Sequence, residues 1–295
     1  MYLSFHDTQR AKYAAIRSHR SLALCVAALL VFATAAGAEQ RVLRVAADPN
    51  NLPFSNERLE GFENRIAELI AKELGAKLEY MWWPQRRGFF RETIGSGRAD
   101  VVMGVPSGFD RVLTTRPYYR STYVFVSRPG AEKVNSFDDP RLRDQIIGVQ
   151  LIGDDAYNAP PAHALSARGM INNIRGFTVY GDYGQDSPPS AIIKAVAAHE
   201  IDLAVAWGPM AGFFAPRQQP PLDIVPVTPE SDGPSRPLTF AIAVGVRRGN
   251  AALKDEIQSA LDRRQTDVDA ILDEFHVPRL ALRAPKSEVN HVAAK

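Results

Sequence analysis

Residues 82–87 read Trp-Trp-Pro-Gln-Arg-Arg and place two indole rings and two guanidinium groups in one short stretch. Tryptophan buries a large apolar area and arginine makes forked hydrogen bonds, so both are enriched where one protein binds another. This chemistry is recognition rather than bond breaking. We predict that the stretch rims a cleft, with Trp83, Arg86 and Arg87 as contacts to a ligand or partner. The alternative is a structural role: strand alternation turns one tryptophan into the core, and the arginines only keep the start of the next helix in contact with water.

Further candidates stand beside the first predicted strand and helix. Asp48, Asn51 and Phe54 follow a strand at 42–47, where the loops of a cleft belong in an open α/β sheet. We predict cleft contact for them, although asparagine is also an ordinary turn residue. Glu63 opens the helix predicted at 61–75, and capping its own helix is the simpler role; the family resemblance given below implies a place near the cleft mouth instead.

Four more residues are placed near the cleft by the ends of later strands. Pro106 and Ser107 follow the strand at 99–104 and are predicted to shape the cleft floor. Tyr119 lies just before the segment where the chain is expected to cross from a first lobe to a second. We predict ligand contact for it, and packing at the hinge between the lobes is the alternative. Trp207 ends a strand and offers a stacking surface or a face for a cation.

Residue patterns of catalysis and metal binding are missing from the sequence. It contains neither a Gly-x-Ser-x-Gly elbow nor a His-Glu-x-x-His motif, and its later histidines lack metal-ligand spacing. No clear set of oxygen ligands forms a cage for calcium or a lanthanide. We therefore expect a protein that is not an enzyme, with no catalytic residue, no metal and no cofactor of its own.

Alternating strands and helices would position these residues. Strands are predicted at 42–47, 77–83, 99–104, 123–128, 146–151, 177–180, 201–207 and 238–249, and helices at 61–75, 89–97, 154–168, 188–200 and, as two helices, 250–278. A proline-rich loop at 215–237 interrupts the pattern. This order predicts an α/β fold of two lobes, each a mainly parallel sheet flanked by helices.

The N-terminus has the features of an export signal. Basic residues precede an apolar run at 21–33, and small residues follow it at Ala36 and Ala38. We predict a secretory signal peptide at 1–38 that is cleaved after Ala38, and hence a periplasmic protein. The run is shorter than the roughly 20 apolar residues of a membrane span, so no stable membrane anchor is expected. The one cysteine, Cys25, lies inside it.

The charge and the length of the chain after residue 38 limit its possible partners and its domain organisation. Four of the 35 Lys and Arg residues and one of the 33 Asp and Glu residues precede residue 39, so the rest is almost neutral. This balance gives no basic face for nucleic acid. We predict a first lobe from 39–128, a second lobe from 129–230, a return to the first lobe at 231–280 and a flexible tail at 281–295.

Several segments run in the order of extracellular solute-binding proteins of family 3, which the chain resembles over about residues 41–280. They include GFENRIAELIAKELG, DVVMG, TTRPYY, IIGVQ, AVAAHEIDLAVAW and VGVRRGNAALKDEIQSAL. The resemblance implies two lobes with a ligand in the cleft between them. It also implies an arginine clamp for a ligand carboxylate. At that place Arg111 lies one residue closer to Ser107 than in the family pattern, and a pairing with Asp110 is the alternative.

Two other positions depart from the pattern of amino-acid binders. Trp207 stands where the family has an aspartate for the ligand ammonium, and an indole cannot form that ion pair. Asp154 and Asp155 stand at a predicted helix start, where carboxylates would repel an anionic ligand. Together with the altered arginine motif, these departures argue against a binder of ordinary α-amino acids.

Five strings between residues 47 and 128 carry a narrower resemblance. ADPNNLPFSN, GFEN, WWPQRRGFFR, DVVMGVPSGFD and LTTRPYYRSTYVFVSR resemble the MxaJ/XoxJ group, accessory proteins encoded with periplasmic PQQ methanol dehydrogenases. This resemblance implies a PQQ-dependent methanol or alcohol dehydrogenase as partner, with any PQQ or metal belonging to the dehydrogenase. Two alternatives stay open. One is the binding component of an ABC importer for another small solute, and the other is an enzyme like the cyclohexadienyl dehydratases of this fold.

Overall fold

The computed structural model describes residues 40–151, 158–179 and 182–282. The predicted signal peptide, the aspartates at 154 and 155 and nearly all of the predicted tail lie outside these ranges. The chain divides into two units, Met1–Arg41 and Val42–Lys295. All helices and strands within the described ranges belong to the second unit.

The first strand set contains β4, β1, β5, β12 and β7, in that order across the sheet. Its strands are β1 (Val42–Ala47), β4 (Lys77–Trp82), β5 (Val101–Pro106), β7 (Tyr119–Ser127) and β12 (Thr239–Val246). The pairs β1/β4 and β1/β5 are parallel, whereas β12 runs antiparallel to both β5 and β7. The short strand β6 (Leu113–Thr114) pairs with β12 in this set, whereas β2 (Asn50–Asn51) and β3 (Ser55–Asn56) form a separate two-stranded sheet.

The second strand set shares β7 and continues through β10, β8 and β9. Its strands are β8 (Ile147–Leu151), β9 (Ile174–Thr178), β10 (Leu203–Trp207) and β11 (Asp223–Pro226). The pairs β8/β9 and β8/β10 are parallel, but β10 and β11 both run antiparallel to β7. The prediction of mainly parallel sheets therefore needs correction to a mixed sheet. The reason is that β7 carries the chain out of the first set and β12 carries it back.

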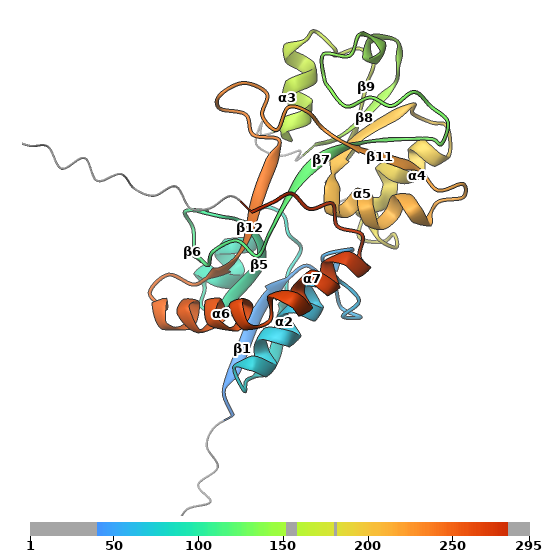
Figure 1. The fold of residues 1–295 in the computed structure, drawn as a ribbon. Coiled ribbons are helices and arrows are strands. Elements are labelled where there is room, and N and C mark those ends of the chain that lie inside the picture. Colours follow the sequence, from blue (N-terminus) through green and yellow to red (C-terminus); the bar gives the residue numbers. More distant parts are fainter. Residues whose placement is uncertain (1–39, 152–157, 180–181, 283–295) are drawn as a thin grey trace, which may run out of the picture. The chain divides into compact units, whose positions relative to one another are not determined.

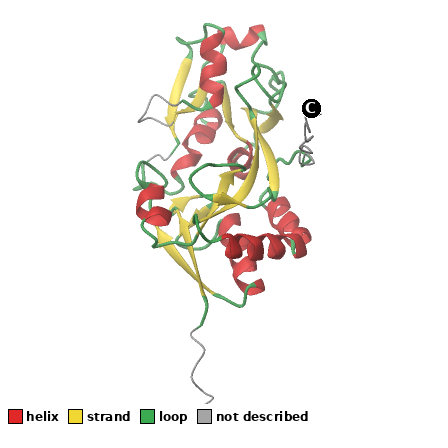
Figure 2. Cartoon of the chain, turned by 90° about the vertical axis from the view of Figure 1, so that its left-hand side faces the viewer, coloured by secondary structure: helices red, strands yellow, loops and turns green. Residues whose placement is uncertain are grey.

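Helices cover both strand sets, as Figures 1 and 2 show. Beside the first set lie α2 (Phe62–Glu73), α6 (Ala251–Arg263) and α7 (Gln265–Glu274). Beside the second lie α3 (Pro160–Ala167), α4 (Ala191–Ala197) and α5 (Gly208–Phe214). Short helical turns occur at Arg91–Gly95, Pro140–Asp144, Pro188–Ser190 and Ala215–Arg217.

Several local predictions differ from the structure, among them the helix at 89–97, which is only the short turn Arg91–Gly95, and the strand at 177–180, which is Ile174–Thr178. The helix expected from 154 begins at Pro160, because proline suits the first helical turn and the two residues before it are not helical. The loop at 215–237 contains β11, which pairs with β7. Helix α5 was not predicted, since its Gly-Pro start looks like a turn in sequence.

The loop before α2 and the start of the helix are fixed by close packing. The backbone nitrogens of Phe62 and Glu63 donate to the carbonyls of Pro53 and Phe54, so the loop after β1 lies directly on the helix start. A Cβ atom at Gly61 would lie 2.0 Å from the Phe54 carbonyl oxygen, so only glycine fits there. This packing places Phe54 and Glu63 side by side.

Candidate functional site

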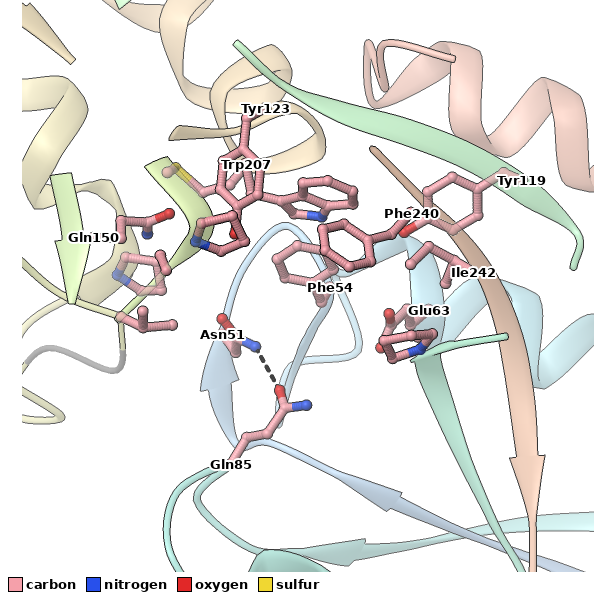
Figure 3. Close-up of a pocket in the computed structure, with 17 residues that line it drawn as sticks. Asn51, Phe54, Glu63, Gln85, Tyr119, Tyr123, Gln150, Trp207, Phe240 and Ile242 are labelled. Atoms are coloured by element: carbon pink, nitrogen blue, oxygen red, sulfur yellow. Dashed lines mark hydrogen bonds between the residues drawn. The ribbon is translucent and has the colours of Figure 1, made fainter. Parts of the chain in front are cut away.

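A cavity of about 420 Å³ lies where the two strand sets meet (Figure 3). Side chains from β2, β5, β7, β8, β12, α2 and the end of β10 contribute to its wall. Its lining comprises Asn51, Phe54, Glu63, Gln85, Gly104, Pro106, Tyr119, Tyr123, Gln150, Ala159, Pro160, Val179, Pro189, Trp207, Met210, Phe240 and Ile242. Such a volume is within the range of small-molecule sites.

Half of the predicted contact residues meet in this cavity. They are Asn51, Phe54, Glu63, Pro106, Tyr119 and Trp207. The prediction of cleft residues missed Gln85, Gln150 and Phe240. Gln85 stands within the Trp-Trp-Pro-Gln-Arg-Arg stretch, and Gln150 and Phe240 lie in predicted strands. Their cavity-facing orientation depends on strand register, which the sequence pattern does not give.

Aromatic rings make up much of the wall. The Trp207 ring contacts Tyr123 edge to face at a centroid distance of 5.3 Å and Phe240 at 5.8 Å. Figure 3 shows Phe54 and Tyr119 on the same side of the cavity as Phe240. Trp207 thus occupies a packing position, as its type suggested, with its ring exposed in part to the cavity.

Glu63 is the one acidic residue among the lining residues that the structure describes, and they include no Lys or Arg. Its half-buried carboxyl group packs against Gly104, where an added Cβ would lie 2.0 Å from Oε1. Desolvation by the surrounding residues raises the pKa of Glu63 to about 8. The carboxyl group is therefore mostly protonated at neutral pH.

Asp48 lies beneath the cavity rim rather than in the lining. It is buried, and its carboxylate accepts hydrogen bonds from the backbone nitrogens of Asn50 at 2.8 Å and Gln85 at 2.6 Å. The Tyr183 hydroxyl also donates to it. The role of Asp48 in this structure is to join the loops after β1 and β4 to the segment after β9.

A group of contacts that we name the latch connects these loops with residues 182–186. Besides Tyr183 with Asp48, Asn50 Nδ2 donates to the Gln185 carbonyl at 2.9 Å. The Arg86 guanidinium lies 5.7 Å from the centre of the Tyr183 ring, within cation-π range. Arg86 therefore contacts the second strand set, although it does not line the cavity.

The neighbours of Arg86 have different environments. Trp82 stacks on Tyr80 with ring centres 4.6 Å apart, and Trp83 packs against the apolar cluster that contains Phe89 and Ile94. Both indoles are half-buried and neither lines the cavity, whereas Arg87 is exposed. Partner contact by Trp83, Arg86 and Arg87 stays a prediction.

Ser107 and Arg111 lie away from the cavity. Ser107 is exposed, and its backbone nitrogen donates to the Ala241 carbonyl at 2.8 Å. Arg111 borders a separate hollow with Phe90, Arg91, Arg247 and Arg248. In this structure no arginine reaches the described cavity lining to hold a carboxylate, which agrees with the altered spacing of the motif.

The described residues contain no group of three or more His, Cys, Asp or Glu side chains that could hold a metal ion. Among the same residues, no helix combines the length and the apolar composition that crossing a membrane requires.

Comparison with known protein families shows which family this chain belongs to. Residues 43–277, which include every element of both strand sets, match the bacterial extracellular solute-binding proteins, family 3. The chain belongs to this family. As a family 3 protein it has the α/β fold of periplasmic binding proteins, and its family is one of solute-binding proteins that are typically not catalysts.

Three similar proteins cover most of this family 3 chain. Protein MoxJ of Methylorubrum extorquens is 31% identical over 84% of this chain and 85% of its own length. Protein MoxJ of Paracoccus denitrificans is 32% identical over 86% of this chain and 95% of its own. The crystal structure of periplasmic binding protein XoxJ from Methylobacterium extorquens AM1 is 36% identical, with a TM-score of 0.67, over 82% of this chain and all of that one.

Proposed function

We propose that this protein is exported to the periplasm, where it binds a PQQ-dependent methanol or alcohol dehydrogenase and assists its assembly or activation. The observation that carries the proposal is the similarity to MoxJ and XoxJ, at 31% to 36% identity over more than four fifths of the chain. The five strings between residues 47 and 128 support the same group.

The cavity favours this role over the binding of ordinary amino acids. Trp207, which the family resemblance matches to the ammonium-binding aspartate, lines the cavity, and Arg111 lies in a different hollow. An α-amino acid would find neither of its two usual charged partners there. A family 3 fold without these partners is suited to a task other than amino-acid capture.

In this proposal the two strand sets act as lobes with the boundaries expected from the sequence, namely 39–128 with 231–280 and 129–230. The exposed arginines beside the latch then form part of the partner surface. Arg86 and Arg87 are exposed at the loop after β4, while the half-buried Trp83 beside them packs against the apolar cluster that contains Phe89 and Ile94. Arginine at such a position forms forked hydrogen bonds with partner carboxylates.

Size-exclusion chromatography with light scattering tests the proposal. The exported form, beginning at residue 39, is mixed with the PQQ methanol dehydrogenase of the same organism at low and moderate salt. We expect a co-eluting complex whose affinity falls about tenfold in the double variant Arg86→Ala/Arg87→Ala. Arg98→Ala is the matched control. Arg98 is also exposed, but it precedes β5, whereas the far end of that strand borders the cavity. Separate peaks at every concentration and salt would exclude the accessory role.

The cavity itself favours a second candidate, the binding component of an importer for a small solute. Its volume of about 420 Å³ suits such a ligand, and Trp207 in its wall would report occupancy. A change of tryptophan fluorescence on adding a solute, lost in Trp207→Phe, would support this candidate. A response to the dehydrogenase alone would exclude it.

A further inference from the structure

The charge of the cavity is as unusual as its aromatic content. Glu63 is the one residue of its described lining that can carry a charge near neutral pH. The other polar side chains of the wall are amides and phenols. An anionic ligand would therefore meet no counter-charge in this cavity, and an ionised Glu63 would repel it.

The carboxyl group of Glu63 has no compensating partner in the part of the chain that the structure describes. No ion pair is formed by it there, and the nearby Arg65 instead pairs with Glu274 at 2.6 Å. Arg65 also lies over the Phe275 ring, away from the cavity lining. Burying a carboxyl group without a counter-ion disfavours its charged form, and a bound cation would remove this penalty.

The titratable groups that face Glu63 are all phenols. They are Tyr80 of β4, Tyr118 just before β7 and Tyr119 at the start of β7, and burial raises the pKa of each above its ordinary value. Strands β5 and β12 contribute only Gly104, Pro106, Phe240 and Ile242 to the wall. None of these groups supplies a positive charge, so within the described ranges Glu63 faces no cation that could act as its counter-ion.

Aromatic rings complete an environment for an organic cation. Phe54, Phe240 and Tyr119 line the same cavity as Glu63, and Trp207 packs beside Phe240 (Figure 3). The faces of such rings carry partial negative charge and attract ammonium groups, most strongly where water is excluded. A carboxylate together with several ring faces is the usual recognition chemistry for alkylated ammonium groups.

We propose that the cavity binds an ammonium cation on a small apolar body, with Glu63 as counter-ion and the rings of Phe54, Tyr119 and Trp207 as its walls. This inference concerns the ligand chemistry of the cavity and does not depend on the partner proposed above. A free amine and a lysine side chain of a partner protein both offer this chemistry.

Binding of such a cation is coupled to loss of the Glu63 proton. Below pH 8 the proton has to leave before the ion pair forms, so affinity rises with pH and levels off above 8. For a ligand that does not titrate, the affinity should increase about 50-fold between pH 6 and pH 8.

Isothermal titration calorimetry with choline and with dimethylbutanol tests the proposal. In dimethylbutanol a carbon atom replaces the quaternary nitrogen, so the two probes differ mainly in charge, and neither titrates in this range. We expect choline to bind at least ten times more tightly than dimethylbutanol at pH 8, and to lose affinity toward pH 6. This series uses the unmodified protein and requires no variant to fold.

A pair of variants locates the site. Glu63→Gln should remove both the preference for choline and its pH dependence, whereas Glu68→Gln, exposed on the same helix, should change neither. Equal affinity for the two probes, no binding of either, or an unchanged pH dependence in Glu63→Gln would each overturn the cation site.

A competition arm separates the two sources of the cation. Saturating choline that dissociates the complex with the dehydrogenase assigns the site to a lysine of the partner, and a complex that persists assigns it to a free amine. A complex that forms although choline does not bind would refute the cation site and leave the accessory role standing. Choline binding without any complex would support the cation site and refute the accessory role.

Discussion

Glu63 shows at the scale of one residue how a change of surroundings changes chemistry. The sequence places it at a helix start, where a carboxylate is ordinarily charged and favourable. In the structure the same carboxyl group packs on Gly104 beside buried phenols. Desolvation therefore outweighs the helix dipole, and the pKa of Glu63 lies near 8 instead of its ordinary 4.5.

The raised pKa makes stability depend on pH. Between pH 4.5 and 8 the unfolded chain loses the Glu63 proton while the folded protein keeps it, so Glu63 lowers the free energy of unfolding progressively across this range. The loss amounts to a few kcal/mol, since one pKa unit corresponds to about 1.4 kcal/mol. Glu63→Gln has no proton to lose and should gain stability over the wild type as pH rises from 5 to 9.

Urea unfolding of the two proteins at pH 5, 7 and 9 measures this effect. The difference in unfolding free energy should be smallest at pH 5 and largest at pH 9, with Glu68→Gln following the wild type. A difference that stays constant with pH would show that Glu63 is not desolvated in the folded protein.

At the scale of elements, the loops after β1 and β4 and the segment after β9 act together through the latch. Asp48 accepts hydrogen bonds from all three, through Asn50, Gln85 and Tyr183. The turn after the two tryptophans is needed for this, because it presents the Gln85 nitrogen to Asp48 and the Arg86 side chain to Tyr183. The aromatic and basic stretch thus has a structural task besides any partner contact.

Removing one hydroxyl should loosen the latch. Tyr183→Phe keeps the ring beneath Arg86 but deletes the hydrogen bond to Asp48, a bond to a charged group worth about 1.5–3 kcal/mol. We expect hydrogen exchange of the Gln185 amide to accelerate about tenfold or more. Tyr80→Phe is the control, since the Tyr80 hydroxyl donates at 3.3 Å to Asn64 within the first strand set. Equal protection of Gln185 in both variants would mean that this bond does not hold the segment.

At the scale of the whole described unit, β7 is the strand that both strand sets share. Its Arg120 is buried and donates to Glu230 through both terminal nitrogens, at 3.1 and 2.6 Å, and to Thr239 at 2.8 Å. These contacts fasten the segment that follows β11 to the start of β12. The carbonyl of Arg120 also accepts from the Leu280 nitrogen at 2.8 Å.

Truncating this arginine should weaken the link between the strand sets. Arg120→Ala loses a forked pair in which the arginine is buried and the Glu230 side chain is 41% exposed, together with the packing of the arginine. We expect this to cost about 2–3 kcal/mol of unfolding free energy in urea titrations. Arg116→Ala is the matched control, because Arg116 pairs with Asp262 at the surface, where an ion pair contributes about 0–1 kcal/mol. Equal losses in the two variants would show that the Arg120 contacts add nothing beyond a surface pair.

The fold could be predicted from sequence wherever one local rule dominated. Helix α2 ends near Gly75, which adopts a positive φ of 60°, and its apolar face packs through Phe62, Ile66 and Ile70. Strands β1, β5 and β10 are short apolar runs and were recognised for that reason. Strand β11 was missed, because its pairing with β7 is a long-range contact inside a proline-rich segment.

Part of the candidate site could likewise be predicted from the sequence, and part could not. Residue type and position near a strand end were enough to propose Asn51, Phe54, Pro106, Tyr119 and Trp207 for the cleft. Family resemblance suggested Glu63 and identified the altered charged positions. Only the tertiary structure decided that Asp48 holds the latch and that Glu63 has no counter-ion among the residues that the structure describes. The physical reason is that alternation and propensity act along the chain, whereas burial, register and the pKa depend on neighbours that are far apart in sequence.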